Sequence, residues 1–286
     1  DLGGLVSIAF IGASTLFPKK LWVRTIAVIS GVWGVSSFCG PLIGGYFVSG
    51  GNWRGAFWAF AAQGLVAVLV APPLLRRQFQ TQKEQNQRMP LARLGLLGVA
   101  VLAICQAGVM ASTVFASFLC VVGVLLLLAF LKLDAGSKNR IFPQGVLNPR
   151  TVPGSGLVMM SSLFMATIAL TVYGPLLMYI IFGAEPLVAG YIIALESLGW
   201  TVVAISTSGV SVRVEARLIR LGSVLVSISM VGLIYAMPSG PLWLIALLSS
   251  IMGMGFGMSW SFVSKRIIAN VSEAERAQAS ASIPTF

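Results

Sequence analysis

Long apolar stretches constrain this chain more than any other feature of its sequence. Nine of them have about the length that an α-helix needs to cross a bilayer, and charged, Pro- or Gly-containing segments separate them. They cover roughly residues 2–17, 24–48, 55–74, 92–110, 114–132, 155–181, 187–208, 219–236 and 241–264. Only 9% of the residues are charged, against about 25% in soluble proteins. The sequence therefore predicts an all-α polytopic membrane protein with about nine transmembrane helices.

The distribution of basic residues predicts the orientation of these helices. Every Lys and Arg except Arg54 lies in alternate connecting segments or at their borders. Basic segments next to membrane spans face the cytoplasm, so these segments are predicted to be cytoplasmic. The same alternation explains the net charge of +11 without a nucleic-acid partner, because the charge is spread over short loops at one membrane face.

The residue types that support metal or hydrolytic chemistry are scarce. The chain has no His, and Cys39, Cys105 and Cys120 lie in predicted spans without the spacing of metal ligands. A glycine-rich run at residues 253–257 lies inside a predicted span, where no strand precedes it as a nucleotide-binding loop requires. We therefore expect no metal, no cofactor and no enzymatic activity.

Small residues recur at four-residue intervals in two of the predicted helices. Ser36, Gly40 and Gly44 form one such stripe, with Pro41 beside it as a bend. The second stripe, in the last predicted helix, consists of Ser249, Gly253, Gly257 and Ser261. Small stripes let helix backbones approach closely in lipid. They are explained either by ordinary tight packing or by an interface that opens and recloses.

The first of these regions resembles a known family. Gly-Pro-Leu-Ile-Gly-Gly at residues 40–45, preceded by Gly31 and Gly34, is similar to the antiporter motif in the fifth helix of drug:proton exporters of the major facilitator superfamily. Trp53 and Arg54, within residues 51–57, resemble the outer-face motif that enters the sixth helix. Residues 183–190 resemble a later helix start in the fourteen-helix branch. The motif residues that would form an interface between helix bundles are Gly31, Gly34, Ser36, Gly40, Pro41, Gly44 and Gly45.

This resemblance implies a domain organisation and a fragment. Residues 1–74 would end an N-terminal six-helix bundle, and 75–150 would hold cytoplasmic loops and two extra central helices. Residues 151–286 would begin a C-terminal bundle. The ends at Asp1 and Phe286 are expected to be edges of a longer protein. Residues 209–217 resemble the cytoplasmic gate loop of the superfamily only loosely, because its Asp is absent.

One acidic residue lies well inside a predicted span. A carboxyl group such as Glu196 can bind and release a proton in a low-dielectric cavity near neutral pH. Trp200 lies one turn further on the same face and offers a ring to an aromatic or cationic substrate. Gln63 is a further candidate for the cavity lining. The alternative is that Glu196 only bonds a neighbouring helix and holds the fold.

The function that the resemblance implies is secondary transport, with proton-coupled efflux of small amphipathic or drug-like compounds by alternating access. A uniporter or importer of a metabolite on the same fold and a membrane assembly protein without transport activity remain as alternatives. The expected partners are a small-molecule substrate, protons and the lipid bilayer, without nucleic acid or metal and with the chain as a monomer. The expected location is the plasma membrane, as the inner membrane of a bacterium.

Overall fold

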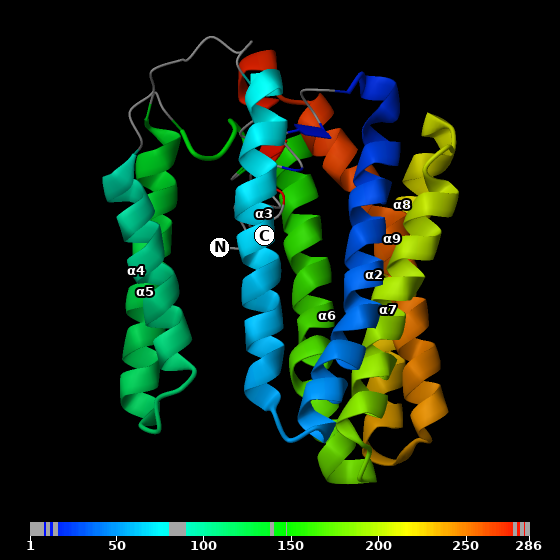
Figure 1. The fold of residues 1–286 in the computed structure, drawn as a ribbon. Helices are drawn as coiled ribbons and strands as arrows, with labels where there is room; N and C mark the ends of the chain where they lie inside the picture. Colours follow the sequence, from blue (N-terminus) through cyan, green and yellow to red (C-terminus); the bar gives the residue numbers. More distant parts are fainter. Residues whose placement is uncertain are drawn as a thin grey trace.

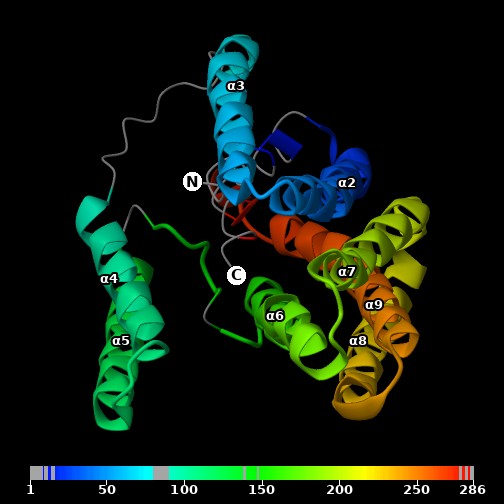
Figure 2. The ribbon, with the colours of Figure 1, turned by 60° about the horizontal axis from the view of Figure 1, so that its bottom comes forward.

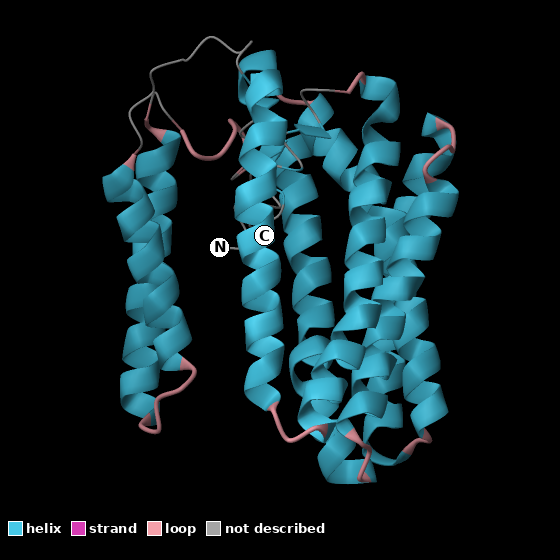
Figure 3. Cartoon of the chain, in the orientation of Figure 1, coloured by secondary structure: helices cyan, strands magenta, loops and turns pink. Residues whose placement is uncertain are grey.

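The fold is helical in the part of the chain that the computed structural model describes, which is residues 9, 12–13, 17–79, 90–137, 140–146, 148–276, 279–280 and 283. Figure 3 shows helices joined by short loops, with no strand among the described residues. This confirms the predicted all-α class. The elements are η1 (Lys19–Leu21), α2 (Trp22–Ser49), α3 (Trp53–Phe79), α4 (Leu91–Ala107), α5 (Thr113–Ala135), α6 (Val152–Phe182), α7 (Pro186–Thr207), α8 (Val212–Ser239), α9 (Leu242–Ala269) and η2 (Glu273–Glu275).

Seven of the described helices are long and apolar enough to cross a membrane, and α4 is a shorter apolar helix of 17 residues. These eight correspond in order to the predicted spans from 24–48 onward. The first predicted span, 2–17, falls almost entirely outside the described residues. Short connections make successive helices antiparallel, so α2, α4, α6 and α8 all begin at the upper end in Figure 1. The basic connecting segments therefore share one end of the molecule.

Local signals explain where the helices begin and end. Gly183 follows α6 with a φ of 62°, a left-handed conformation that glycine adopts without strain. Its N–H bonds Tyr179 O and the Ala184 N–H bonds Met178 O, which together stop the helix. Pro186 then opens α7 at a position where a helix needs no N–H donor. The boundary predicted from residues 183–190 is thus a tight turn between two helices.

Three predicted helix boundaries are wrong by more than one turn. The structure starts α8 at Val212 instead of 219, extends α9 to Ala269 instead of 264, and extends α3 to Phe79 instead of 74. Arg213, Glu215 and Lys265 therefore lie on helices, although the sequence placed them in loops. The physical reason is that charged side chains at a helix end remain compatible with the helix when its first or last turn leaves the hydrocarbon layer.

The helices form a packed group with a separate pair beside it. The α9 helix packs closely against both α7 and α8, α6 contacts all three, and α2 lies along α7 (Figures 1 and 2). The main buried apolar cluster lies where these helices meet. In contrast, α3 packs on α2, while α4 and α5 pack on each other and make no comparable contact with another described helix. The candidate site lies within the group, at the contact between α2 and α7.

Candidate functional site

The contact between α2 and α7 joins the glycine-rich motif to the helix that carries Glu196. The two helices meet at successive levels, because a Cβ added to Gly45 would lie 3.0 Å from Leu187 Cδ1. A Cβ added to Gly190 would lie 3.0 Å from Pro41 Cβ. At a third level, a Cβ on Gly34 would lie 2.8 Å from Thr201 Cβ, closer than real Cβ atoms approach. Small residues are thus required on both helices for this close approach.

The face that makes this contact differs from the predicted stripe. Gly34, Pro41 and Gly45 fall on one side of α2, since steps of seven and four residues nearly complete whole turns. A Cβ on Gly40 or Gly44 would meet no described atom within 4 Å, and Ser36 is exposed. Within the described residues, Ser36, Gly40 and Gly44 therefore take no part in the contact between α2 and α7, and their role in an interface between helix bundles stays a prediction. Four-residue spacing alone does not identify which of several small-residue faces meets a neighbour.

Gly31 belongs to the contact face as well. A Cβ on Gly31 would lie 3.7 Å from Ile205 Cδ1, an ordinary van der Waals distance. The motif residues that the structure brings to α7 are thus Gly31, Gly34, Pro41 and Gly45. They span residues 31–45 of α2, about half of that helix, and their partners run from Leu187 to Ile205, almost the full length of α7.

Glu196 lies at the middle of α7 and is partly buried. Its Oε2 accepts a hydrogen bond of 3.3 Å from Thr171 Oγ1 on α6. Within the described residues no ion pair neutralises this carboxylate. A carboxyl group held by one long hydrogen bond from a hydroxyl can exist with or without its proton, because the hydroxyl both donates and accepts.

The ring of Trp200 on α7 connects α2 to α9. Its centroid lies 5.9 Å from that of Trp33 on α2, 4.6 Å from Phe256 and 5.7 Å from Trp260 on α9. Phe164 of α6 completes this aromatic cluster at 5.1 Å from both Phe256 and Trp260. The Trp33 side chain is 44% exposed, so the cluster is accessible from the α2 side. Such rings can hold flat apolar or cationic molecules.

The buried indole N–H of Trp200 has no hydrogen-bond partner within the described residues. Burial of an unpaired donor costs free energy, about 1–3 kcal/mol in mutational data. The Trp200 N–H is therefore available to a substrate acceptor or to water that reaches the cluster.

The second predicted small-residue stripe holds Glu196 and Trp200 in place. A Cβ on Gly253 would overlap the backbone carbonyl of Glu196, and one on Gly257 would overlap that of Trp200. Gly199 of α7 faces α9 in turn, since its Cβ would lie 2.5 Å from Ser250 O. The α7 and α9 backbones are thus in direct contact at Glu196 and along the turn that follows it. For this stripe, tight packing is what the structure shows.

Three other predicted residues lie away from Glu196. Gln63 is exposed on α3, which packs on α2 alone among the helices with substantial contacts, so the structure does not place it beside Glu196. Trp53 and Arg54 form the first turn of α3. The Arg54 guanidinium carbon lies 4.2 Å above the Trp53 ring, a cation–π contact at the end opposite the basic segments.

Two buried ion pairs were missed because the sequence placed their acids in loops. Glu215 on α8 is 2% exposed and pairs with Lys265 on α9. Asp134 on α5 is also 2% exposed and pairs with Arg93 of α4 at 2.5 Å. A sequence signal existed in both cases, since Asp134 lies two residues after the predicted span 114–132 and Glu215 lies four residues before the predicted span 219–236.

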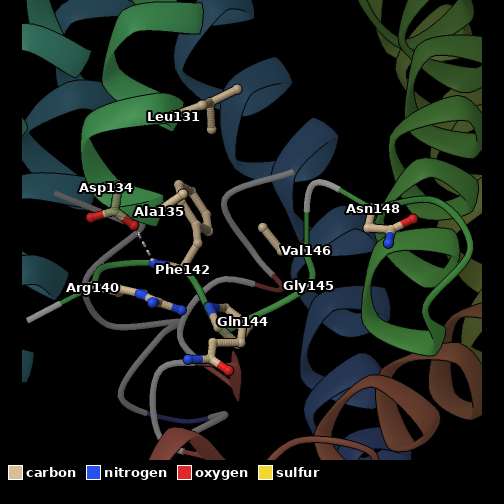
Figure 4. Close-up of a pocket in the computed structure, with 10 residues that line it drawn as sticks. Leu131, Asp134, Ala135, Arg140, Phe142, Gln144, Gly145, Val146 and Asn148 are labelled. Carbon is tan, nitrogen blue, oxygen red and sulfur yellow. Dashed lines mark hydrogen bonds between the residues drawn. The ribbon is translucent and has the colours of Figure 1, made fainter. Parts of the chain in front are cut away.

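Asp134 also organises the segment that follows α5. Its carboxylate accepts hydrogen bonds from the backbone N–H groups of Ile141 and Phe142 at 2.9 to 3.0 Å. Figure 4 shows Phe142 and Arg140 next to Asp134 at a cavity of about 240 Å³. Because Asp134 is saturated by these donors, the cavity offers no free carboxylate. We interpret it as part of a structural connection.

Comparison with known proteins identifies the family. The family model described as Major Facilitator Superfamily matches residues 2–286. A "probable multidrug-efflux transporter" of Mycobacterium tuberculosis, in the sequences from two strains, is 28% identical over 298 aligned residues, which cover 98% of this chain. A thioclapurine efflux transporter of Claviceps purpurea is 29% identical over 75 residues, covering 22% of this chain and 14% of that protein. The chain spans 62% of the length of the M. tuberculosis relatives.

The match extends over the glycine motif, the helix of Glu196 and the aromatic cluster alike. The predicted resemblance is confirmed by a model that covers nearly every residue. The chain is a multi-pass membrane protein that belongs to the Major Facilitator Superfamily.

Proposed function

We propose that this chain forms part of a proton-coupled exporter of small amphipathic compounds. The observation that carries the proposal is the position of Glu196, an acid without an ion-pair partner among the described residues, close in sequence to the ring of Trp200 at the contact between α2 and α7. The names of the M. tuberculosis relatives support efflux as the activity. Membership of this superfamily also supports the expectation that the chain is not an enzyme.

The proposed transport step is a movement of α2 relative to α7. Rocking of α2 against α7 would open a path between the helices toward one membrane face and then the other. Pro41 and the small residues around it give a smooth surface without interlocking side chains, so the helices can separate at low cost. The aromatic cluster would hold the apolar part of the substrate while the helices move.

Proton coupling would operate through Glu196. With the proton bound, the carboxyl is neutral and tolerates a closed, dry contact. Loss of the proton leaves a charge that favours water or a cationic substrate in the cavity. Exchange of a proton for a substrate at the same cluster would link their movements in opposite directions.

The remaining parts of the proposal concern topology. We propose that residues 1–74 and 151–286 belong to the two bundles, with 75–150 between them. The separate packing of α4 and α5 supports this division. We further propose a monomer in the inner membrane of a bacterium, with the basic segments in the cytoplasm.

The test uses the full-length protein in liposomes with an imposed proton gradient and a fluorescent cationic dye. We expect dye movement to follow the gradient in the wild type and to lose this dependence in Glu196→Gln. Glu185→Gln is the matched control, because Glu185 is an exposed acid just before the same helix and makes no side-chain cap. Gradient-driven transport that Glu196→Gln leaves unchanged would refute the assigned role, and transport insensitive to any gradient would favour a uniporter.

A further inference from the structure

A cavity of about 380 Å³ lies at the end of the helices where the basic segments gather, away from Glu196. One wall carries Lys19, Lys20 and Arg24, at the start of α2. The opposite wall consists of the turn between α7 and α8, residues 208–210, with Glu215 and Lys265. The volume is within the range of about 300–1,000 Å³ that is typical of ligand pockets.

The charges around this cavity are unbalanced. Glu215 is the acid in the wall, and Lys265 already pairs with it. Lys19, Lys20 and Arg24 make no ion pair within the described residues. Three cations therefore line one space, and the described residues supply no counterion for them. All three side chains are exposed, so solvent screens part of their repulsion, and an anion between them would offset the rest.

The backbone adds to the positive potential. The α8 helix begins beside the cavity wall, and the N-terminal end of a helix carries a partial positive charge with free N–H groups. Lys and Arg side chains together with helix N-termini are the groups that proteins use to bind phosphate.

The cavity lies at the end of a membrane-spanning helix. Lys19 and Lys20 begin the segment Lys19–Phe47, which is long and apolar enough to cross a membrane. Basic residues at the end of such a span lie at the height of the lipid headgroups and attract anionic lipid. We propose that this cavity binds a phosphate group at the membrane surface, carried by an anionic phospholipid headgroup or by a free phosphate compound.

A ligand in this cavity would lie at the basic end of the contact between α2 and α7. It would bridge the start of α2 to the turn after α7 and so favour the arrangement in which this end of the contact is closed. The binding site itself does not depend on the proposed transport activity or on Glu196.

The test is phospholipid binding to the full-length protein, measured by native mass spectrometry with phosphatidylglycerol. We expect Lys20→Gln/Arg24→Gln to weaken binding about 25-fold, because both residues line the cavity and a basic side chain beside a bound anion contributes about fivefold. Arg213→Gln/Arg217→Gln is the matched control, since both arginines are exposed on α8 outside the cavity wall and the charge change is identical. We expect this control to change the affinity less than twofold.

A charge-preserving variant separates binding from folding. Lys20→Arg/Arg24→Lys should retain most of the affinity that the glutamine variant loses. Calorimetric titration with inorganic phosphate distinguishes the two sources: a phosphate affinity that only the cavity variant loses, with lipid binding unchanged, identifies a free phosphate compound. Equal losses in the cavity and control variants, or no loss of either ligand, would overturn the proposal.

Discussion

Gly34 and Gly40 lie on the same helix and differ in what surrounds them, so a single methyl group at each position tests the assigned face of α2. In Gly34→Ala the new Cβ would lie 2.8 Å from Thr201 Cβ, an atom that cannot rotate away, so α2 or α7 must shift. In Gly40→Ala it would meet no described atom within 4 Å.

The expected magnitudes follow from two opposing contributions. Replacement of Gly by Ala inside a helix stabilises it by about 1 kcal/mol, and this gain is common to both variants. Overpacking of a close contact costs about 1–3 kcal/mol, and only Gly34→Ala incurs it. We therefore expect Gly34→Ala to be less stable than Gly40→Ala by about 1–3 kcal/mol.

The assay is reversible unfolding in mixed micelles of increasing SDS fraction, followed by circular dichroism of the helices. Gly44→Ala serves as a second variant without a described neighbour and should behave as Gly40→Ala does. If Gly34→Ala and Gly40→Ala differ by less than about 0.5 kcal/mol, the assignment of the contact face is incorrect.

Three further perturbations address other contacts. Gly253→Ala places a methyl group on the Glu196 carbonyl and should cost about 3 kcal/mol or more in the same unfolding assay, unless the α7–α9 contact is looser than described. Lys265→Met leaves the buried Glu215 carboxylate unpaired and should destabilise by about 3–5 kcal/mol, with recovery in Glu215→Gln/Lys265→Met; equal stability of both would contradict the buried pair. Asp134→Asn weakens bonds to Arg93 and to the backbone of residues 141–142, so limited proteolysis should cut near residue 140 several-fold faster. Glu273→Gln should leave that rate unchanged, because the Glu273 side chain is 87% exposed in its ion pair with Arg276.

The sequence was sufficient to predict the helices because apolar runs of membrane-spanning length leave little choice of structure. All spans from 24–48 onward correspond to described helices, and the glycine motif pointed to the helix that makes the contact with α7. The face of that helix could not be predicted. Gly34 and Gly40 are equally small, and only the position of Thr201 distinguishes them.

The candidate site, too, could be predicted only in part. Glu196 was identified because an acid inside an apolar span is costly and rare. The ring contacts of Trp200 with Trp33 and Phe256 join residues far apart in the sequence, so no local pattern could reveal them. The charges at helix ends were misplaced for a related reason: whether Glu215 faces water or Lys265 depends on how α8 and α9 pack.

The most direct measurement of the central claim is transport by a protein in which α2 and α7 are cross-linked. Gly45→Cys/Leu187→Cys places two thiols at the close contact, in a background where Cys39, Cys105 and Cys120 are replaced by Ser. Gly232→Cys/Leu248→Cys is the matched control, because it joins α8 to α9 through another Gly–Leu contact. If α2 and α7 separate during transport, oxidation of the first pair stops transport, reduction restores it, and oxidation of the control pair has little effect. Unchanged transport by a fully cross-linked α2–α7 pair would contradict the account.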